Sequence, residues 1–258
     1  MDERTIQPGG SEHLPPTVAR PGAGVAGRLD DPRALQILTT EHWSLLSARS
    51  LVYNEAFARA GMFLTFLSAS LVALALVAQG MGFDRDFLVL AAIVLGFDLF
   101  IGLATLGRVT DASNDDLRCI AGMNRIRHAY LEMAPGLQRY FVTSQFDDVS
   151  GILSTYGELP DKPPSWFLGF VHGLTTTTGM VAIITAAVGG ILGSVVAILI
   201  GAPPNVALGV GLGSFTALFL VGIGIGYRSF SGLGARLRSE FPMPPSDAAG
   251  SGDRTPGA

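Results

Sequence analysis

Long apolar runs alternate with polar stretches along this chain, and four of the runs are long enough to cross a bilayer. The run from Phe87 to Leu106 contains one carboxylate, Asp98, near its middle. Twenty residues at the helical rise cover roughly 30 Å, the thickness of the hydrocarbon core. A central Asp costs about 3 kcal/mol on the insertion scale, and the apolar residues of the run together return more than that. The run is therefore predicted to insert as a helix despite its charge.

The other three runs carry no formal charge and have similar lengths. They lie at about 60–79, within 178–200, and at about 206–227. The polar turn Gly80–Asp86 is so short that spans one and two must form an antiparallel hairpin, and Gly201–Asn205 joins spans three and four in the same way. The predicted fold class is therefore all-α, a polytopic membrane protein with four transmembrane helices in two hairpins.

Outside the spans the pattern is polar but partly helical in period. Asp31 followed by Pro32 is a helix-start signal. Apolar residues at spacings of three and four extend span two as one long helix to Pro135, and a second amphipathic segment follows over 137–156. Trp166, Phe167 and Phe170 favour an interfacial entry helix before span three. These segments predict a helical cytoplasmic layer.

The predicted organisation has six parts. They are a disordered cytoplasmic tail (1–29), cytoplasmic helices (30–59), the first transmembrane hairpin (60–107), a cytoplasmic helical segment (108–165), the interfacial helix with the second hairpin (166–228), and a cytoplasmic tail (229–258).

Basic residues predict the orientation. Those that flank the spans lie on one side of the predicted topology, and Arg85 alone lies on the other. Positively charged flanks stay in the cytoplasm. Both termini and the middle segment are therefore expected to be cytoplasmic.

Small and polar residues predict which faces of the spans meet protein. In span one they form a stripe of Gly61, Thr65, Ser68, Val72, Ala75 and Gln79. In span two, Ala91, Asp98, Gly102 and Thr105 share one face, so Asp98 is expected to point inward. Small residues let helices approach closely, and Gly189 and Gly193 form a GxxxG spacing in span three. Span four has glycines on two faces, and Gly222 and Gly226 are expected to contact a neighbouring subunit.

Composition supports a membrane location and removes several functions. The chain is 48% hydrophobic and only 15% charged, with a mean hydropathy of +0.43. A net charge of -4 and dispersed basic residues argue against a nucleic-acid partner. Cys119 is the single cysteine, which excludes an intramolecular disulfide and a cysteine-based metal site. Arg outnumbers Lys and Ala and Gly are abundant, so we expect a GC-rich bacterium and its cytoplasmic membrane.

Asp98 is the strongest candidate for chemistry, because intramembrane carboxylates usually face a cavity, an ion path or a partner charge. The structural alternative is polar glue, with Asp98 hydrogen-bonded to Thr65, Ser68 or a backbone group. His172, Thr175 and Thr178 lie at the expected mouth of span three, where the hydroxyls either line an entrance or bond to their own helix. The four histidines show no metal-ligand spacing, and no catalytic set is visible. We therefore expect no metal, no cofactor and no enzyme activity.

The stretch GMNRIRHAYLEMAP, from Gly122 to Pro135, follows a two-span hairpin. It resembles a family of uncharacterised four-span membrane proteins from GC-rich bacteria, and the resemblance covers Thr40 to Arg228. More distantly, the hairpin and the helix after it resemble small oligomeric bacterial membrane proteins, including predicted pore-forming effectors of conflict systems. These resemblances imply topology and transfer no functional residue.

Three functions remain open at the level of sequence. The first is a homo-oligomeric pore or channel, because four spans enclose little volume and the glycine seams suit further helix contacts. The second is a proton-coupled secondary transporter that uses Asp98. The third is a non-transporting membrane scaffold that binds a protein partner through its cytoplasmic helices. The partner, the ion and the copy number are not encoded in any motif.

Overall fold

The computed structural model describes residue 29, residues 31–156 and residues 173–244. Its elements are α1 (Pro32–Met81), α2 (Arg85–Met133), the 3-10 helix η1 (Pro135–Tyr140), α3 (Val149–Thr155), α5 (Thr177–Leu199) and α6 (Pro204–Arg236). No strand occurs in this described part. Helices α1, α2, α5 and α6 are long and apolar enough to cross a membrane. The chain is an all-α, multi-pass membrane protein, and the predicted fold class is confirmed.

The caps that begin the two longest helices are visible in the sequence. Asp31 accepts a hydrogen bond from the backbone N–H of Arg33 at 2.9 Å, and Pro32 occupies the first helical turn of α1. Asp84 accepts in the same way from Phe87 at 2.9 Å to begin α2. Gly82 adopts a φ of 75° between them, a value that glycine tolerates at no steric cost.

Helix α1 is continuous, so the predicted cytoplasmic helices of 30–59 and the first span are one element of 50 residues. At the helical rise it is about 75 Å long, more than twice the hydrocarbon thickness. Helix α2 extends past its span in the same way, as predicted. Both helices therefore project far beyond the bilayer on the side away from their connecting turn, which we call the polar end of the molecule.

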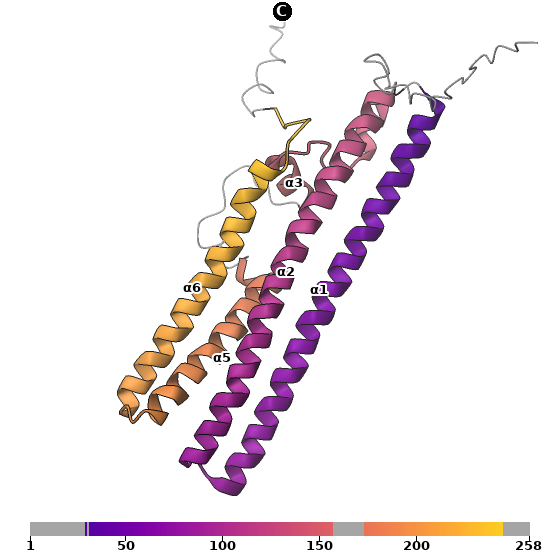
Figure 1. Ribbon diagram of the computed structural model, residues 1–258. Helices are drawn as coiled ribbons and strands as arrows, with labels where there is room; N and C mark the ends of the chain where they lie inside the picture. Colours follow the sequence, from indigo (N-terminus) through magenta and orange to yellow (C-terminus); the bar gives the residue numbers. More distant parts are fainter. Residues whose placement is uncertain (1–28, 30, 157–172, 245–258) are drawn as a thin grey trace, which may run out of the picture.

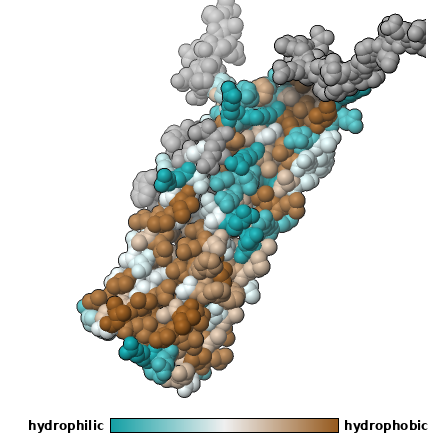
Figure 2. Space-filling view, viewed as in Figure 1, coloured by the Kyte–Doolittle hydropathy of each residue, from teal (hydrophilic) through white to brown (hydrophobic). Residues whose placement is uncertain are grey.

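The four spans form a row rather than a closed bundle. α1 packs on α2, α2 on α5, and α5 on α6, so α1 and α6 lie at the two edges (Figure 1). The turn between α1 and α2 and the turn between α5 and α6 lie at one end, and η1 and α3 pack against α2 at the polar end. Figure 2 shows apolar side chains over the body of the row and a concentration of polar ones at the polar end.

Two cores hold this arrangement together. The larger core lies between α1, α2 and α5 and includes Phe63, Leu95 and Val188. The smaller core lies at the polar end, where Ile120 and Met123 of α2 meet Ile152 of α3. The second core fixes the short α3 against the extension of α2.

The predicted protein-facing stripe of span one does not pack against the rest of this chain. Gly61, Thr65, Ser68, Val72, Ala75 and Gln79 are all exposed on the outside of the row. The buried residues of α1 are Ala60, Phe63, Leu67, Ser70 and Leu74. Lipid is as apolar as a protein core, so hydrophobicity does not separate the two faces of a membrane helix, and large side chains fill the contact with α2.

Two polar segments also differ from their predictions. The segment 137–156 is not one amphipathic helix, because η1 ends at Tyr140 and α3 begins only at Val149. The predicted tail of 229–258 begins as helix, since α6 continues to Arg236, and residues up to Pro244 are part of the described structure. The predicted interfacial helix at 166–170 lies outside the described residues.

Candidate functional site

The carboxylate of Asp98 lies inside the row, with a relative exposure of 1%. The structure buries the whole predicted stripe of Ala91, Asp98, Gly102 and Thr105. The Ser70 hydroxyl of α1 donates a hydrogen bond to Oδ1 of Asp98 at 3.0 Å. The other oxygen, Oδ2, is buried and has no hydrogen-bond partner within the described part of the chain.

A second unpaired oxygen lies close to this carboxylate along α2. The hydroxyl of Thr185 in α5 is buried and also lacks a hydrogen bond among the described residues. It packs against Gly102, where a Cβ would lie 2.7 Å from Thr185 Oγ1. Gly102 is one helical turn from Asp98, so α1, α2 and α5 each bring one polar side chain to this stretch of the core.

Thr65 and Ser68, the predicted partners of Asp98, do not contact it. Each donates to a carbonyl of its own helix, Gly61 at 2.9 Å and Leu64 at 2.7 Å. A Ser or Thr hydroxyl in a helix commonly satisfies itself in this way. Ser70, which the stripe did not include, takes the role instead because it lies on the buried face with Phe63 and Leu67.

A groove on the outside of α1 and α2 reaches this site from the side. It has a volume of about 680 Å³ and is lined by apolar residues such as Phe66, Phe97 and Phe100. Ser70 is also part of its lining. The residue that donates to Asp98 therefore separates the buried carboxylate from the lipid-facing groove.

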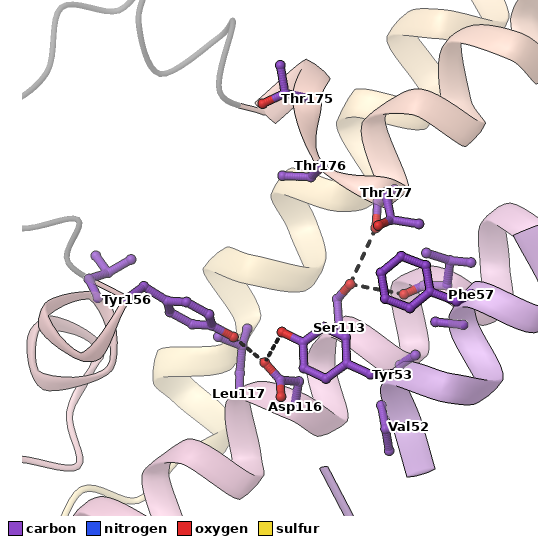
Figure 3. A pocket seen from close by; sticks show the side chains of 15 residues that line it. Val52, Tyr53, Phe57, Ser113, Asp116, Leu117, Tyr156, Thr175, Thr176 and Thr177 are labelled. Atoms are coloured by element: carbon purple, nitrogen blue, oxygen red, sulfur yellow. Dashed lines mark hydrogen bonds between the residues drawn. The ribbon is translucent and has the colours of Figure 1, made fainter. Parts of the chain in front are cut away.

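A second cavity, of about 550 Å³, lies at the polar end between α1, α2, α3 and the start of α5. Asp116 of α2 forms part of its wall and is almost fully buried. Its Oδ1 accepts from Arg49 Nε at 2.6 Å, and its Oδ2 accepts from the hydroxyls of Tyr53, at 3.1 Å, and Tyr156. Figure 3 shows the two tyrosines meeting the carboxylate from α1 and from the end of α3.

This cluster changes the titration of the groups around Asp116. Burial alone would lower the pKa of Arg49, but its hydrogen bond and ion pair with Asp116 outweigh burial and raise that pKa. Burial, with the hydrogen bond to Asp116 and its charge, raises the pKa of the Tyr156 hydroxyl above its ordinary value. Arg49 therefore stays charged and Tyr156 stays neutral, and the cluster serves as a fixed joint between α1, α2 and α3.

Asp147 forms a third polar cluster and is fully buried. It accepts from Arg125 Nε at 2.5 Å, from the Ser239 hydroxyl at 2.7 Å, and from the backbone N–H groups of Glu240 and Phe241 at 3.0 and 2.8 Å. Burial raises its pKa, but these donors outweigh burial and hold the pKa at about 2. Asp147 thereby attaches the segment after α6 to α2.

The predicted mouth residues are only partly placed. Thr175 and Thr178 line the 550 Å³ cavity, and Thr178 shares a hydrogen bond of 3.3 Å with Ser113 of α2. His172 lies outside the described residues. The hydroxyls thus belong to a cavity wall, at the polar end and not beside Asp98.

The predicted packing glycines have different surroundings. A Cβ on Gly189 would meet Leu218, and one on Gly193 would lie 2.6 Å from Ser214 Oγ, so both pack α5 on α6. Gly222 faces Ala182 of α5 within the same chain, and Gly226 has no atom near its missing Cβ. The prediction that Gly222 contacts a neighbouring subunit is therefore wrong.

Sequence reasoning missed most of the hydrogen-bond partners in these clusters. Arg49 and Asp116 lie 67 residues apart in the sequence, and Asp147 and Phe241 lie 94 residues apart. No local spacing in the sequence therefore predicts either contact. Within the described residues, no group of three His, Cys, Asp or Glu side chains is placed to hold a metal ion.

Comparison of the chain with protein-family models, with curated proteins and with solved structures gives no match.

Proposed function

We propose that this membrane protein moves protons across the bilayer, with Asp98 as the group that carries them. The observation that carries the proposal is the unpaired, buried Oδ2 of Asp98 in the middle of a membrane span. Burying a carboxylate is costly unless its charge is paired or removed, and such residues within membrane spans usually lie on ion or proton paths. The described ion pairs place no Arg, Lys or His against Asp98.

The chemistry of the site favours a proton over a metal ion. One carboxylate and the hydroxyls of Ser70 and Thr185 are fewer oxygen ligands than Ca²⁺ takes. A proton needs no coordination shell, and it removes the buried charge of the carboxylate. Binding and release of a proton at Asp98 would change the hydrogen bond with Ser70, and so would link protonation to the contact between α1 and α2.

The position of Asp98 supports a carrier that alternates between two sides. The deepest α2 residue in the wall of the polar-end cavity is Val109, eleven positions and about 16 Å from Asp98. Thr105 lies between them and is buried. Leu106 and Val109 are buried there as well, so we expect release toward the polar end to require a movement of α2 against α1 or α5.

Proton flux into liposomes tests this proposal. Purified protein is reconstituted with a pH-sensitive dye inside, and dye fluorescence follows an imposed pH or potential gradient. Wild type should acidify the lumen, and Asp98→Asn, which keeps the size and polarity of the side chain, should reduce the rate to that of empty liposomes. Ser70→Ala should change the rate, whereas Ser68→Ala should not, since Ser68 bonds only to its own helix.

The outcomes separate the alternatives. An unchanged rate in Asp98→Asn would remove the carboxylate from the path. Absence of flux in folded wild type would favour the scaffold, in which the polar end binds a protein partner.

A homo-oligomeric pore is the second candidate, and the open row of spans favours it. α6 lies at the edge, and Gly209, Gly213 and Gly224 have no atom within 4 Å of their missing Cβ positions. Small residues permit close helix contact, so a second copy could pack there. Gly213→Leu should then reduce the particle mass in nanodiscs, together with ion conductance. A wild-type particle that contains one chain would contradict the pore proposal and would not affect the proposal of a proton carrier.

The proposed home is a bacterial cytoplasmic membrane, with both termini on the cytoplasmic side. The arginines that flank the spans support this orientation, since Arg49, Arg108 and Arg228 all lie toward the polar end and Arg85 begins α2 at the opposite end.

A further inference from the structure

We infer that the cavity between α2, α5 and α6 binds one uncharged amphipathic lipid, such as a monoacylglycerol. This cavity adjoins the one beside Asp116, with which it shares Ser113, Leu117, Thr176 and Thr178, and it has a volume of about 430 Å³, within the usual range for small-molecule sites. None of the described residues that line it is charged. The inference is independent of the proposed proton transport.

Along α6 the lining changes from apolar to polar, and α2 adds the polar side chains of Thr110, Ser113 and Asn114 before the apolar Leu117. Ala182, Phe219 and Gly222 lie at the end of the cavity that is deeper in the membrane spans. Asn114, Tyr227 and Ser229 lie toward the polar end. The direction of each helix sets this order, because α2 and α6 run toward the polar end and α5 runs away from it (Figure 1). A molecule with an apolar tail and a polar head fits such a gradient in one orientation.

The polar groups at the mouth fall into two sets. Thr176 and Thr178 already take part in hydrogen bonds, with Gly173, Gly179 and Ser113. The amide of Asn114 and the hydroxyls of Tyr227 and Ser229 make none within the described part of the chain. An amide and two hydroxyls both donate and accept, so they suit a head group of hydroxyls or ester carbonyls.

The absence of charge in the lining selects the class of lipid. A phosphate or carboxylate head would lose hydration in this half-enclosed site and find no cation among the described lining residues. A glycerol head loses less hydration, because each of its hydroxyls can exchange water for a protein hydrogen bond. The site therefore favours a neutral glyceride over the anionic lipids of the same leaflet.

Gly226 keeps the cavity open. It is part of the lining, and no heavy atom lies within 4 Å of the position that its Cβ would occupy. A large side chain there would fill space that the bound lipid needs, without displacing a neighbour. Gly224 provides a matched control, because it also has open space at its Cβ position but is not part of this cavity.

Photolabelling of the full chain in nanodiscs tests the inference. The probe is a monoacylglycerol with a diazirine in its acyl chain, and mass spectrometry locates the labelled peptides. Label should appear on α2 near Thr110 and on α6 near Phe219, and excess unlabelled monooleoylglycerol should remove it. Oleate and lysophosphatidylglycerol at equal concentration should compete poorly.

The variants distinguish a bound lipid from general lipid contact. Gly226→Leu should lower labelling about tenfold, as expected for overpacking a fitted site, and Asn114→Ala should lower it about fivefold through one lost hydrogen bond. Gly224→Leu should label like wild type, and circular dichroism confirms that each variant is folded. Equal labelling of Gly226→Leu and wild type, or equal competition by the charged lipids, would overturn the inference.

Discussion

Asp147 is fully buried, yet donated hydrogen bonds hold its pKa at about 2. The unfolded value is about 3.9, so the folded pKa is the lower of the two. A lowered folded pKa stabilises the protein above the unfolded pKa, and this stabilisation is lost as pH falls through about 4 toward 2. The difference corresponds to roughly 2.5 kcal/mol, and it should act on the contact between α2 and Ser239–Phe241.

Asp147→Asn should therefore free that segment at neutral pH. Because about 2.5 kcal/mol corresponds to roughly a seventyfold change in an opening equilibrium, amide hydrogen exchange at Glu240 and Phe241 should accelerate by about that factor. Asp115→Asn is the control, since Asp115 is exposed and pairs only with Arg118. Equal exchange in wild type and Asp147→Asn would show that the carboxylate does not hold the segment.

The burial of a single residue could be predicted where the pattern along its own helix was sufficient. The small-residue stripe of span two placed Asp98 inside the protein, because a carboxylate cannot face lipid cheaply. Ser70 was missed because the same reasoning, applied to α1, chose the face with the most small and polar residues. Ser70 lies on the other face, where its neighbours are large apolar side chains. Asp116 and Asp147 were missed because their partners lie on other elements.

Among the elements, α5 and α6 show the closest helix packing around glycine. A Cβ on Gly193 would lie 2.6 Å from Ser214 Oγ, and overpacking of this kind costs about 1–3 kcal/mol. Gly193→Leu should therefore lower the denaturant concentration at which the second hairpin unfolds in detergent. Gly213→Leu, where the Cβ position is open, should leave this unfolding midpoint of the monomer unchanged. Equal unfolding midpoints in both variants would mean that the contact between α5 and α6 can rearrange to accommodate a larger side chain.

Elements followed from sequence where length and capping determine them. The four spans, the cap at Asp31 and the long extension of α2 all come from local pattern. The region between Pro135 and Val149 did not, because its conformation depends on contacts with α2 and with the segment after α6. Asn124 illustrates this, since its amide donates to the carbonyl of Phe146 at 2.7 Å.

At the scale of the whole molecule, orientation is open to a direct test through Cys119. The polar end is expected in the cytoplasm, so a membrane-impermeant maleimide should label Cys119 only after spheroplasts are opened. Burial, with the charges of Asp116 and Asp115, raises the pKa of its thiol, so the reaction should be slow even then. Asp84→Cys in a Cys119→Ala background should label from outside. Labelling of Cys119 in intact spheroplasts would reverse the topology.

Helix α2 is one unbroken helix that carries Asp98 within the membrane and Asn124 well beyond it. The two residues are 26 positions apart, or about 39 Å at the helical rise. It has no proline, and hence no kink of that origin, along this length. Because both residues lie on this one helix, we expect a rotation imposed by a change at Asp98 to pass along α2 toward the attachment points of α3 and of the segment after α6.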